Sequence, residues 1–411
     1  MRADPGEEPA RPPEPRRHVR ARRWTVTALA AVLALVGALV AATALRIVGD
    51  LVERGDVQSF YAQPTDALPG APGSIVKSET LVGVPVDARG WRIMYRSTDL
   101  NGDPVVATGV VVTPLGPAPD GGRTVVSWGH PTTGSARACA PSLFVDPYLG
   151  IEGMRVLLDR GYTVVATDYT GMGTDGPDSY LIGVTEGHNV LDAVRAAQAI
   201  PGAEASSDVV LWGHSQGGQA VLFAAELAQQ YAPELDVRAV AAAAPAADLA
   251  ALMRTHLDDV SGVTIGSYAF SAFAEIYADR GANLSDVLTP EAVAIQPQMN
   301  ALCLLTHVEE LHRIADPVVG RFVVADPTTT EPWATLLAEN SAGSSAFAAP
   351  LLVLQGLDDE VVRPSDTEAY VARARSLRMD VSYRTVSIAT HGTIAYLGLP
   401  DLVEFLDRVG V

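Results

Sequence analysis

The fold is decided by residues 209–218, which read Val209-Val210-Leu211-Trp212-Gly213-His214-Ser215-Gln216-Gly217-Gly218. Four apolar residues in a row are typical of a short buried strand, and the apolar run at 219–228 is typical of a helix. A strand, a sharp turn at Gly-x-Ser-x-Gly and a helix form a nucleophile elbow, in which the serine is strained and its hydroxyl stands exposed above the sheet. Ser215 is therefore the candidate nucleophile. A Gly/Ser turn that merely links strand to helix is the alternative.

A serine nucleophile needs an adjacent base and an acid that orients the base. Two later loops offer them, each after a predicted strand: one carries Asp358 and Asp359, and the other carries His391. The chain order serine, acid, histidine is the one that this strand–elbow–helix architecture uses. We predict Ser215 as nucleophile, His391 as base and Asp359 as the orienting acid, with Asp358 as the alternative acid.

A serine nucleophile of this kind also needs two backbone N–H donors for the oxyanion. Gln216, directly after the nucleophile, is expected to supply one of them. The other is expected from the glycine-rich turn at 129–134, where Pro131 has no N–H, so that Thr132 becomes the candidate. The Thr132 hydroxyl offers a third donor. His214 occupies the variable position of the elbow and is not well placed to act as base.

Strand and helix patterns alternate over 60–248 and return over 346–411. This alternation predicts an α/β fold whose sheet is mostly parallel and covered on both faces, after antiparallel opening strands. The region 249–345 breaks the rhythm and contains only helical patterns, which we interpret as a helical cap over the active site. Its aromatic residues are either packing or a substrate-facing surface. The expected helices of this region are 249–257, 267–280, 290–294 and 299–315.

The sequence of the amino terminus predicts that the rest of the chain is exported. Residues 1–23 are rich in Pro, Arg and Glu and are expected to be a disordered cytoplasmic segment. The uncharged run from Trp24 to Leu45 is long enough to cross a bilayer as a helix, and the arginines before it should stay in the cytoplasm. We predict a membrane anchor at 24–46 with an extracytoplasmic catalytic domain. A cleaved signal peptide, with Ala42-Thr43-Ala44 as its cleavage site, is the alternative and would give a secreted protein.

Composition excludes several kinds of site. The net charge of -19 argues against nucleic-acid binding, and Lys77 is the only lysine, which argues against Schiff-base chemistry. No cofactor is predicted. His307 and His312 lie five positions apart and share no helix face, so no metal site is predicted. Cys139 and Cys303 are the only cysteines, and an even count in an exported chain predicts one disulfide, with two buried thiols as the alternative.

Several motifs outside the elbow resemble the secretory lipase family of α/β-hydrolases, the group of lipase A-like fungal enzymes and exported actinobacterial lipases. The similarity spans about residues 60–405. Its marks, besides the elbow, are Tyr95-Arg96-Ser97, Gly129-His130-Pro131-Thr132-Thr133-Gly134, Cys139-Ala140-Pro141-Ser142, Asp168-Tyr169-Thr170-Gly171-Met172-Gly173, Leu191-Asp192-Ala193-Val194-Arg195-Ala196-Ala197 and Ala244-Pro245-Ala246-Ala247-Asp248-Leu249.

The resemblance implies an α/β-hydrolase fold with a helical lid, and hydrolysis of acylglycerols or simpler esters. The chain departs from the family pattern at Pro131, where the family usually has glycine, and this puts the geometry of the oxyanion turn in question. Two other functions stay open from the sequence. One is an exported serine peptidase on the same fold, and the other is a non-catalytic binding protein of the cell envelope.

Overall fold

The structure is a computed structural model that describes residues 59–411. The segment expected to be disordered, 1–23, and the expected membrane segment, 24–46, both lie outside the described residues. Within 59–411, no helix combines the length and the apolar character that crossing a bilayer requires.

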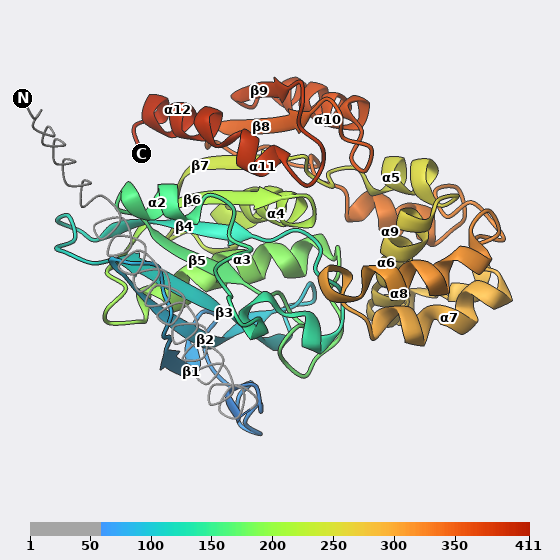
Figure 1. Cartoon of the computed structure of the whole chain (residues 1–411), viewed down its shortest axis with the longest axis horizontal. Helices are drawn as coiled ribbons and strands as arrows, with labels where there is room; N and C mark the ends of the chain where they lie inside the picture. Colours follow the sequence, from blue (N-terminus) through green and yellow to red (C-terminus); the bar gives the residue numbers. More distant parts are fainter. Residues whose placement is uncertain (1–58) are drawn as a thin grey trace, which may run out of the picture. The chain divides into compact units, whose positions relative to one another are not determined.

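A nine-stranded mixed sheet organises the chain from residue 60 onward (Figure 1), in the spatial order β1-β2-β3-β5-β4-β6-β7-β8-β9. The pairs β1–β2, β2–β3 and β3–β5 are antiparallel, and every pair from β5–β4 to β8–β9 is parallel. The predicted sheet, mostly parallel with antiparallel opening strands, is confirmed. The strands are β1 (Ile75–Thr80), β2 (Ala88–Thr98), β3 (Pro104–Pro114), β4 (Arg123–Gly129), β5 (Thr163–Thr167), β6 (Ala205–His214), β7 (Asp236–Ala243), β8 (Leu351–Gly356) and β9 (Val381–Val386).

Helices cover both faces of the sheet, because its central strands are apolar on both sides. In β8, for example, Leu351 and Val353 enter one core cluster while Leu352 and Leu354 enter the other. The first cluster lies under α3, α4 and α10, and the second under α2, α11 and α12. These helices are α2 (Met154–Asp159), α3 (Gly183–Gln198), α4 (Gln216–Tyr231), α10 (Pro364–Ser376), α11 (Ile394–Leu397) and α12 (Leu399–Val409).

The helical segment between β7 and β8 (Figure 1) packs around a third core cluster, which also takes in Tyr180, Leu181 and Ile182 before α3. Tyr268, Phe270 and Phe273 are buried in it with Trp333, so these aromatic side chains serve packing. The elements are α5 (Leu249–His256), α6 (Val260–Ile276), η3 (Ala278–Arg280), η4 (Leu284–Asp286), α7 (Pro290–Asn300), α8 (Leu304–Ala315), η5 (Asp316–Val318) and α9 (Trp333–Glu339).

The helices of this segment differ from the expected ranges; α8, for example, begins at Leu304 rather than at 299. α6 begins at Val260, seven residues before the expected start at 267, because the Asp259 side chain accepts the N–H of Gly262 at 2.7 Å and caps the helix. α7 continues through Pro297 to Asn300. α9 was not predicted, because a helix of 7 residues is too short to display a helical period.

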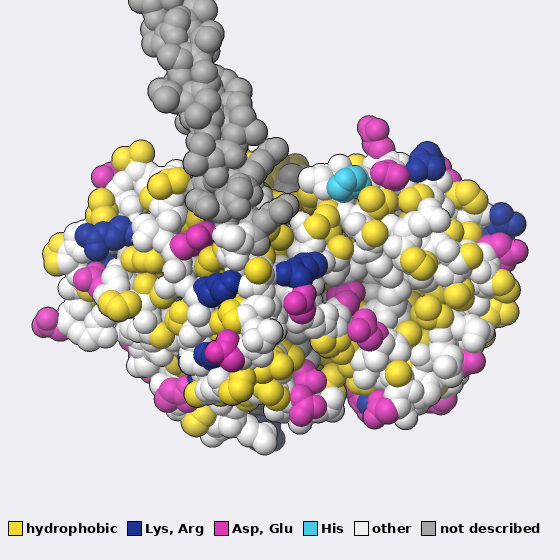
Figure 2. Space-filling view, turned by 90° about the horizontal axis from the view of Figure 1, so that it is seen from below, with side chains coloured by type: hydrophobic (Ala, Val, Ile, Leu, Met, Phe, Trp, Pro, Cys, Tyr) yellow, Lys and Arg dark blue, Asp and Glu magenta, His cyan; other side chains and the backbone are white. Residues whose placement is uncertain are grey.

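The surface carries mixed charges. On the face in Figure 2, acidic, basic and apolar side chains are interspersed. Many arginines are paired with carboxylates, as in Arg280–Glu339 and Arg195–Glu234, both at 2.6 Å. Exposed pairs of this kind contribute little to stability.

The predicted disulfide joins Cys139 to Cys303 across 164 residues. Cys139 is the last residue of η1 (Arg137–Cys139), in the loop that follows β4 before η2 (Pro141–Leu143), and Cys303 directly precedes α8. One residue further on, the Leu304 N–H donates to the Thr133 carbonyl at 2.8 Å. The start of α8 is thus tied to the 129–134 turn by a hydrogen bond and to Cys139, shortly after that turn, by a covalent bond.

Removing this crosslink should destabilise the protein strongly. In the chain-entropy account, a bridge that closes so long a loop contributes about 5 kcal/mol, and Cys303→Ser is expected to lose an amount of that order in urea denaturation. Cys139→Ser is the matched control, since it breaks the same bond and should cost the same, with no further loss in the double variant. Two free thiols in unreduced wild-type peptides, seen by mass spectrometry, would contradict the bond itself.

Candidate active site

The elbow forms where β6 ends at His214 and α4 begins at Gln216. Ser215 lies between them with φ 56° and ψ -116°, a backbone conformation that costs energy for any residue with a side chain. Gly217 cannot be replaced here, because a Cβ on it would lie 1.9 Å from the carbonyl oxygen of Gly129. Ser215 keeps 9% of its surface exposed, less than the elbow pattern predicts, because the His391 ring contacts its hydroxyl.

The structure brings the three predicted triad residues together. The Ser215 hydroxyl donates to His391 Nε2 at 2.8 Å, and His391 Nδ1–H donates to Asp359 Oδ2, also at 2.8 Å. The three residues come from loops after β6, β8 and β9, which are parallel neighbours or next neighbours in the sheet. Their carboxyl ends meet at one edge, and this edge is where active sites of open α/β sheets lie.

Only Asp359 of the two adjacent aspartates reaches the histidine. Its side chain is buried, and Oδ1 accepts the N–H groups of Val361 and Val362 at 2.8 and 2.9 Å, which fixes the carboxylate in place. Asp358 is exposed and contributes only its backbone N–H, which donates to the Ala389 carbonyl at 3.1 Å. The geometry therefore favours Asp359 as the orienting acid.

His391 is arranged to be neutral before the reaction. Burial lowers its pKa below the ordinary value of 6.5, and this effect outweighs the hydrogen bond to Asp359, which raises the pKa. A neutral imidazole with Nδ1 protonated has a free lone pair on Nε2, which faces the Ser215 hydroxyl. The site can thus transfer the serine proton to the ring.

The two predicted oxyanion residues lie in different environments. Gln216 is the first residue of α4, where a backbone N–H has no partner within the helix, and its side chain donates to Glu186 at 2.6 Å. The Thr132 hydroxyl is 2.7 Å from the Tyr180 hydroxyl, and either oxygen can be the donor, so its role as a third oxyanion donor stays a prediction. The role of both N–H groups as oxyanion donors stays a prediction.

Replacing Thr132 with proline should remove one oxyanion donor. We expect kcat to fall by about 10²–10³, the scale of one such donor, with little change in KM because the donor acts on the transition state. Thr132→Val is the matched control, since it deletes only the hydroxyl contact with Tyr180. Pro131→Gly keeps the N–H of Thr132 and should cost at most about 1 kcal/mol of stability. A folded Thr132→Pro enzyme with unchanged kcat would place the second donor elsewhere.

Two buried acids near the predicted triad could not be identified from the sequence. Glu186 of α3 accepts the Leu181 N–H at 3.0 Å besides the Gln216 side chain, and burial raises its pKa well above the ordinary range. Glu152 pairs with His214, the elbow residue taken from the sequence as merely variable. Neither acid stands in a motif, and each meets its partner across at least 30 residues, so only the tertiary structure brings them to the site.

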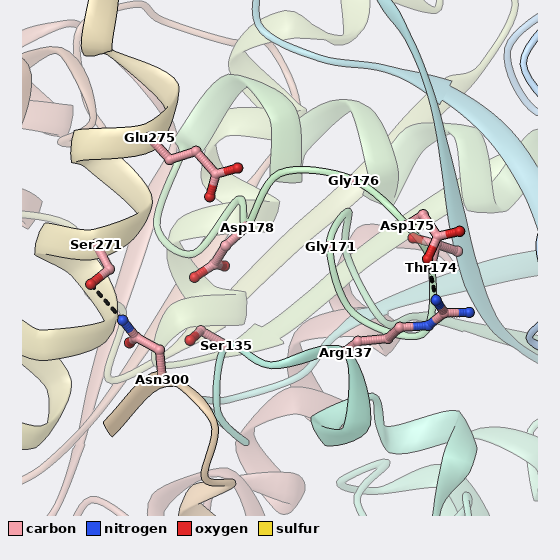
Figure 3. Close-up of a pocket in the computed structure, with 10 residues that line it drawn as sticks. All are labelled: Ser135, Arg137, Gly171, Thr174, Asp175, Gly176, Asp178, Ser271, Glu275 and Asn300. Carbon is pink, nitrogen blue, oxygen red and sulfur yellow. Dashed lines mark hydrogen bonds and ion pairs between the residues drawn. The ribbon is translucent and has the colours of Figure 1, made fainter. Parts of the chain in front are cut away.

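A polar cavity of about 450 Å³ opens between the loops that follow β4 and β5 and the helical segment (Figure 3). Ser135 and Asp178 line it from those loops, and Ser271, Glu275 and Asn300 line it from α6 and the end of α7. Burial, together with the charge of Glu275, raises the pKa of Asp178 to about 7. None of the triad residues lines this cavity. In residues 59–411, no group of three His, Cys, Asp or Glu side chains is placed to hold a metal ion.

The comparison with protein families covers the site. A sequence model of the secretory lipase family matches residues 150–409, which include the elbow and both downstream triad loops. The chain belongs to the secretory lipase family. Family membership and the disulfide together indicate an extracellular location.

Individual relatives have low sequence identity to this chain, but the similarity covers most of its length. The chain is 24% identical over 369 residues to a Mycobacterium tuberculosis (strain CDC 1551 / Oshkosh) protein named "Probable inactive lipase MT1628", with 84% of this chain and 80% of that protein covered. It is 26% identical over 381 residues to Lipase A of Arthroderma benhamiae (strain ATCC MYA-4681 / CBS 112371), with 85% and 78% covered. Lipase A of Candida antarctica in its closed state superposes with a TM-score of 0.70 at 21% identity, covering 85% of each chain. The α/β-hydrolase fold predicted from the sequence is confirmed.

Proposed function

We propose that the protein is a serine-dependent carboxylic-ester hydrolase that acts on lipid-like esters through an acyl-enzyme intermediate. The observation that carries the proposal is the hydrogen-bonded chain from Ser215 through His391 to Asp359, with both contacts at 2.8 Å. In a site that had lost its activity, we would not expect this alignment to be retained around a strained serine. This complete triad is our argument for catalysis, although one relative bears the name of an inactive lipase.

The chemistry follows from the two hydrogen bonds. Ser215 Oγ attacks the ester carbonyl while His391 Nε2 takes the hydroxyl proton, and Asp359 stabilises the imidazolium that results. The backbone N–H groups of Gln216 and Thr132 are proposed to bind the oxyanion of the tetrahedral intermediate. His391 then gives its proton to the leaving alcohol, and the ester bond breaks. A water molecule, deprotonated by His391, releases the acid and restores the serine.

Apolar side chains on the loops beside the triad support a lipid-like substrate. Leu357 follows β8 and Ile388 follows β9, and 46% and 75% of their surfaces are exposed. Leu149 and Tyr396 are also exposed, and the Tyr396 hydroxyl is 3.4 Å from the Leu149 carbonyl. Exposed apolar side chains grouped around a site favour contact with an apolar ligand. The acyl chain is the part of the ester that such a rim would meet.

We propose that residues 249–345 form a cap on the catalytic domain, which comprises 60–248 and 346–411. The attachment of α8 through Cys303 and the shared core with Tyr180 and Leu181 of the catalytic domain support this division. For the amino terminus, we propose an anchor at 24–46 that holds the enzyme on the outer side of a membrane. The alternative remains cleavage and release into the medium.

Two measurements on the purified protein test the function. We expect hydrolysis of p-nitrophenyl esters of increasing acyl length and of emulsified triglyceride, and covalent labelling by a fluorophosphonate at Ser215. Labelling without ester hydrolysis, but with cleavage of peptide p-nitroanilides, would favour a peptidase. Neither labelling nor hydrolysis by the folded protein would favour a binding protein and would overturn the proposal.

A further inference from the structure

A second histidine–carboxylate pair lies directly behind the triad histidine. His214 is the last residue of β6, and its ring packs against the ring of His391 with the centroids 5.0 Å apart and the planes at 45°. His214 Nδ1 lies 3.0 Å from a carboxylate oxygen of Glu152 and 3.2 Å from the other. Both side chains are almost fully buried, at 3% and 8% exposure.

Glu152 is held in place from the sheet. It lies in the loop that leads into α2, and its backbone carbonyl accepts the indole N–H of Trp212 at 2.9 Å. Trp212 is two residues before His214 on β6, so the same strand fixes both the histidine and its acid. A buried carboxylate is costly unless it is paired, and the His214 ring is the partner that Glu152 has here.

His391 needs support of this kind because it stands on a loop. Its own hydrogen bonds run along one line, from Asp359 to Ser215, and they leave the ring free to tilt about that line. The His214 ring contacts it from the side and opposes this motion. A displacement of about 1 Å in such a group can cost about 10² in rate, so restraint of the ring matters for turnover.

We propose that His214 and Glu152 form a positioning pair, in which the His214 ring supports the His391 ring, Glu152 anchors His214, and the opposite electrostatic effects of the two groups on His391 compensate each other. The pair deepens the proposed function and rests on it, since it acts on the reaction through His391. His214 and Glu152 do not touch the reacting atoms.

Charge compensation gives the pair a signature in pH. The charged groups that act on His391 are Asp359 and Glu152, which raise its pKa, and His214, which lowers it. Tyr396 faces Glu152 from α11, and its own pKa is raised by burial first and by the Glu152 charge second. Removing His214 alone leaves the Glu152 charge uncompensated, so the pKa of His391 should rise. Removing the Glu152 charge as well should lower it again.

The test measures kcat and KM for a soluble p-nitrophenyl ester against pH in three variants. For His214→Gln, we expect the acid limb of kcat/KM to move up by about one pH unit and the plateau kcat to fall about tenfold, with KM unchanged. His214→Gln with Glu152→Gln should return the limb toward that of the wild type but keep the low plateau. His214→Phe with Glu152→Gln retains an aromatic ring without either charge and should restore most of kcat.

A matched control separates this role from general stability. His256 of α5 pairs with Asp259 at 2.8 Å, away from the triad, so His256→Gln should leave the pH profile unchanged even if the melting temperature falls. Unchanged acid limbs and plateau rates within twofold of the wild type in all three variants would overturn the proposed positioning role of the pair. A limb that moves in His214→Gln but does not return in the double variant would overturn charge compensation. A folded wild-type protein without ester hydrolysis or phosphonate labelling would instead overturn the proposed function.

Discussion

Ser215→Ala is expected to abolish ester hydrolysis, with kcat falling by about 10⁶, because loss of the nucleophile removes the covalent route entirely. The fold should survive, since the only side-chain contact of the Ser215 hydroxyl in the described structure is with His391 Nε2. Alanine also keeps the backbone N–H of the elbow, which donates to the Ala243 carbonyl at 2.9 Å.

The measurement is single-substrate kinetics with a p-nitrophenyl ester, together with a thermal melt. Fluorophosphonate labelling of Ser215→Ala should disappear in parallel. A variant with normal melting and activity near that of the wild type would remove Ser215 from the mechanism and, with it, the proposed function.

Asp359→Asn is expected to lower kcat by about 10⁴, whereas Asp358→Asn should stay within about twofold of the wild type. Asparagine can keep the loop closed, because its Oδ1 can still accept the N–H groups of Val361 and Val362. Its Nδ2 then faces His391 Nδ1, and two donors cannot pair. The ring is driven to the tautomer that has no lone pair for the Ser215 proton.

Asp358→Asn is the matched control, because it makes the same chemical change one residue away. The carboxylate of Asp358 is exposed, and the only contact described for this residue is its backbone N–H, which the substitution keeps. Both variants are compared by kcat/KM over pH, with folding checked by melting. The reverse order of the two losses would move the orienting acid to Asp358.

The site could be predicted from the sequence wherever a residue followed a recognisable strand. Ser215, Asp359 and His391 each stand in the loop after a strand, and parallel strands bring such loops to one edge. The sequence favours Asp359 and keeps Asp358 as the alternative, because both neighbours occupy the same loop and only burial distinguishes them. The disulfide could be expected from the count of two cysteines.

The parts that could not be predicted depend on contacts between distant segments. Glu152 and His214 are 62 positions apart and carry no common motif. α9 is a single short helix held by the burial of Trp333, and burial does not appear in a pattern of seven residues. α6 begins early because the Asp259 side chain caps it. In the sequence, the following run with Ser261 and Gly262 is typical of a loop, so the cap is not recognised.

The link between α8 and the segment after β4 makes the stability of the protein depend on its compartment. The bond between Cys139 and Cys303 forms only where thiols are oxidised, so a chain still in the cytoplasm lacks this restraint close to the turn that carries Thr132. Material prepared in a reducing host should therefore stay less stable until the bond has formed.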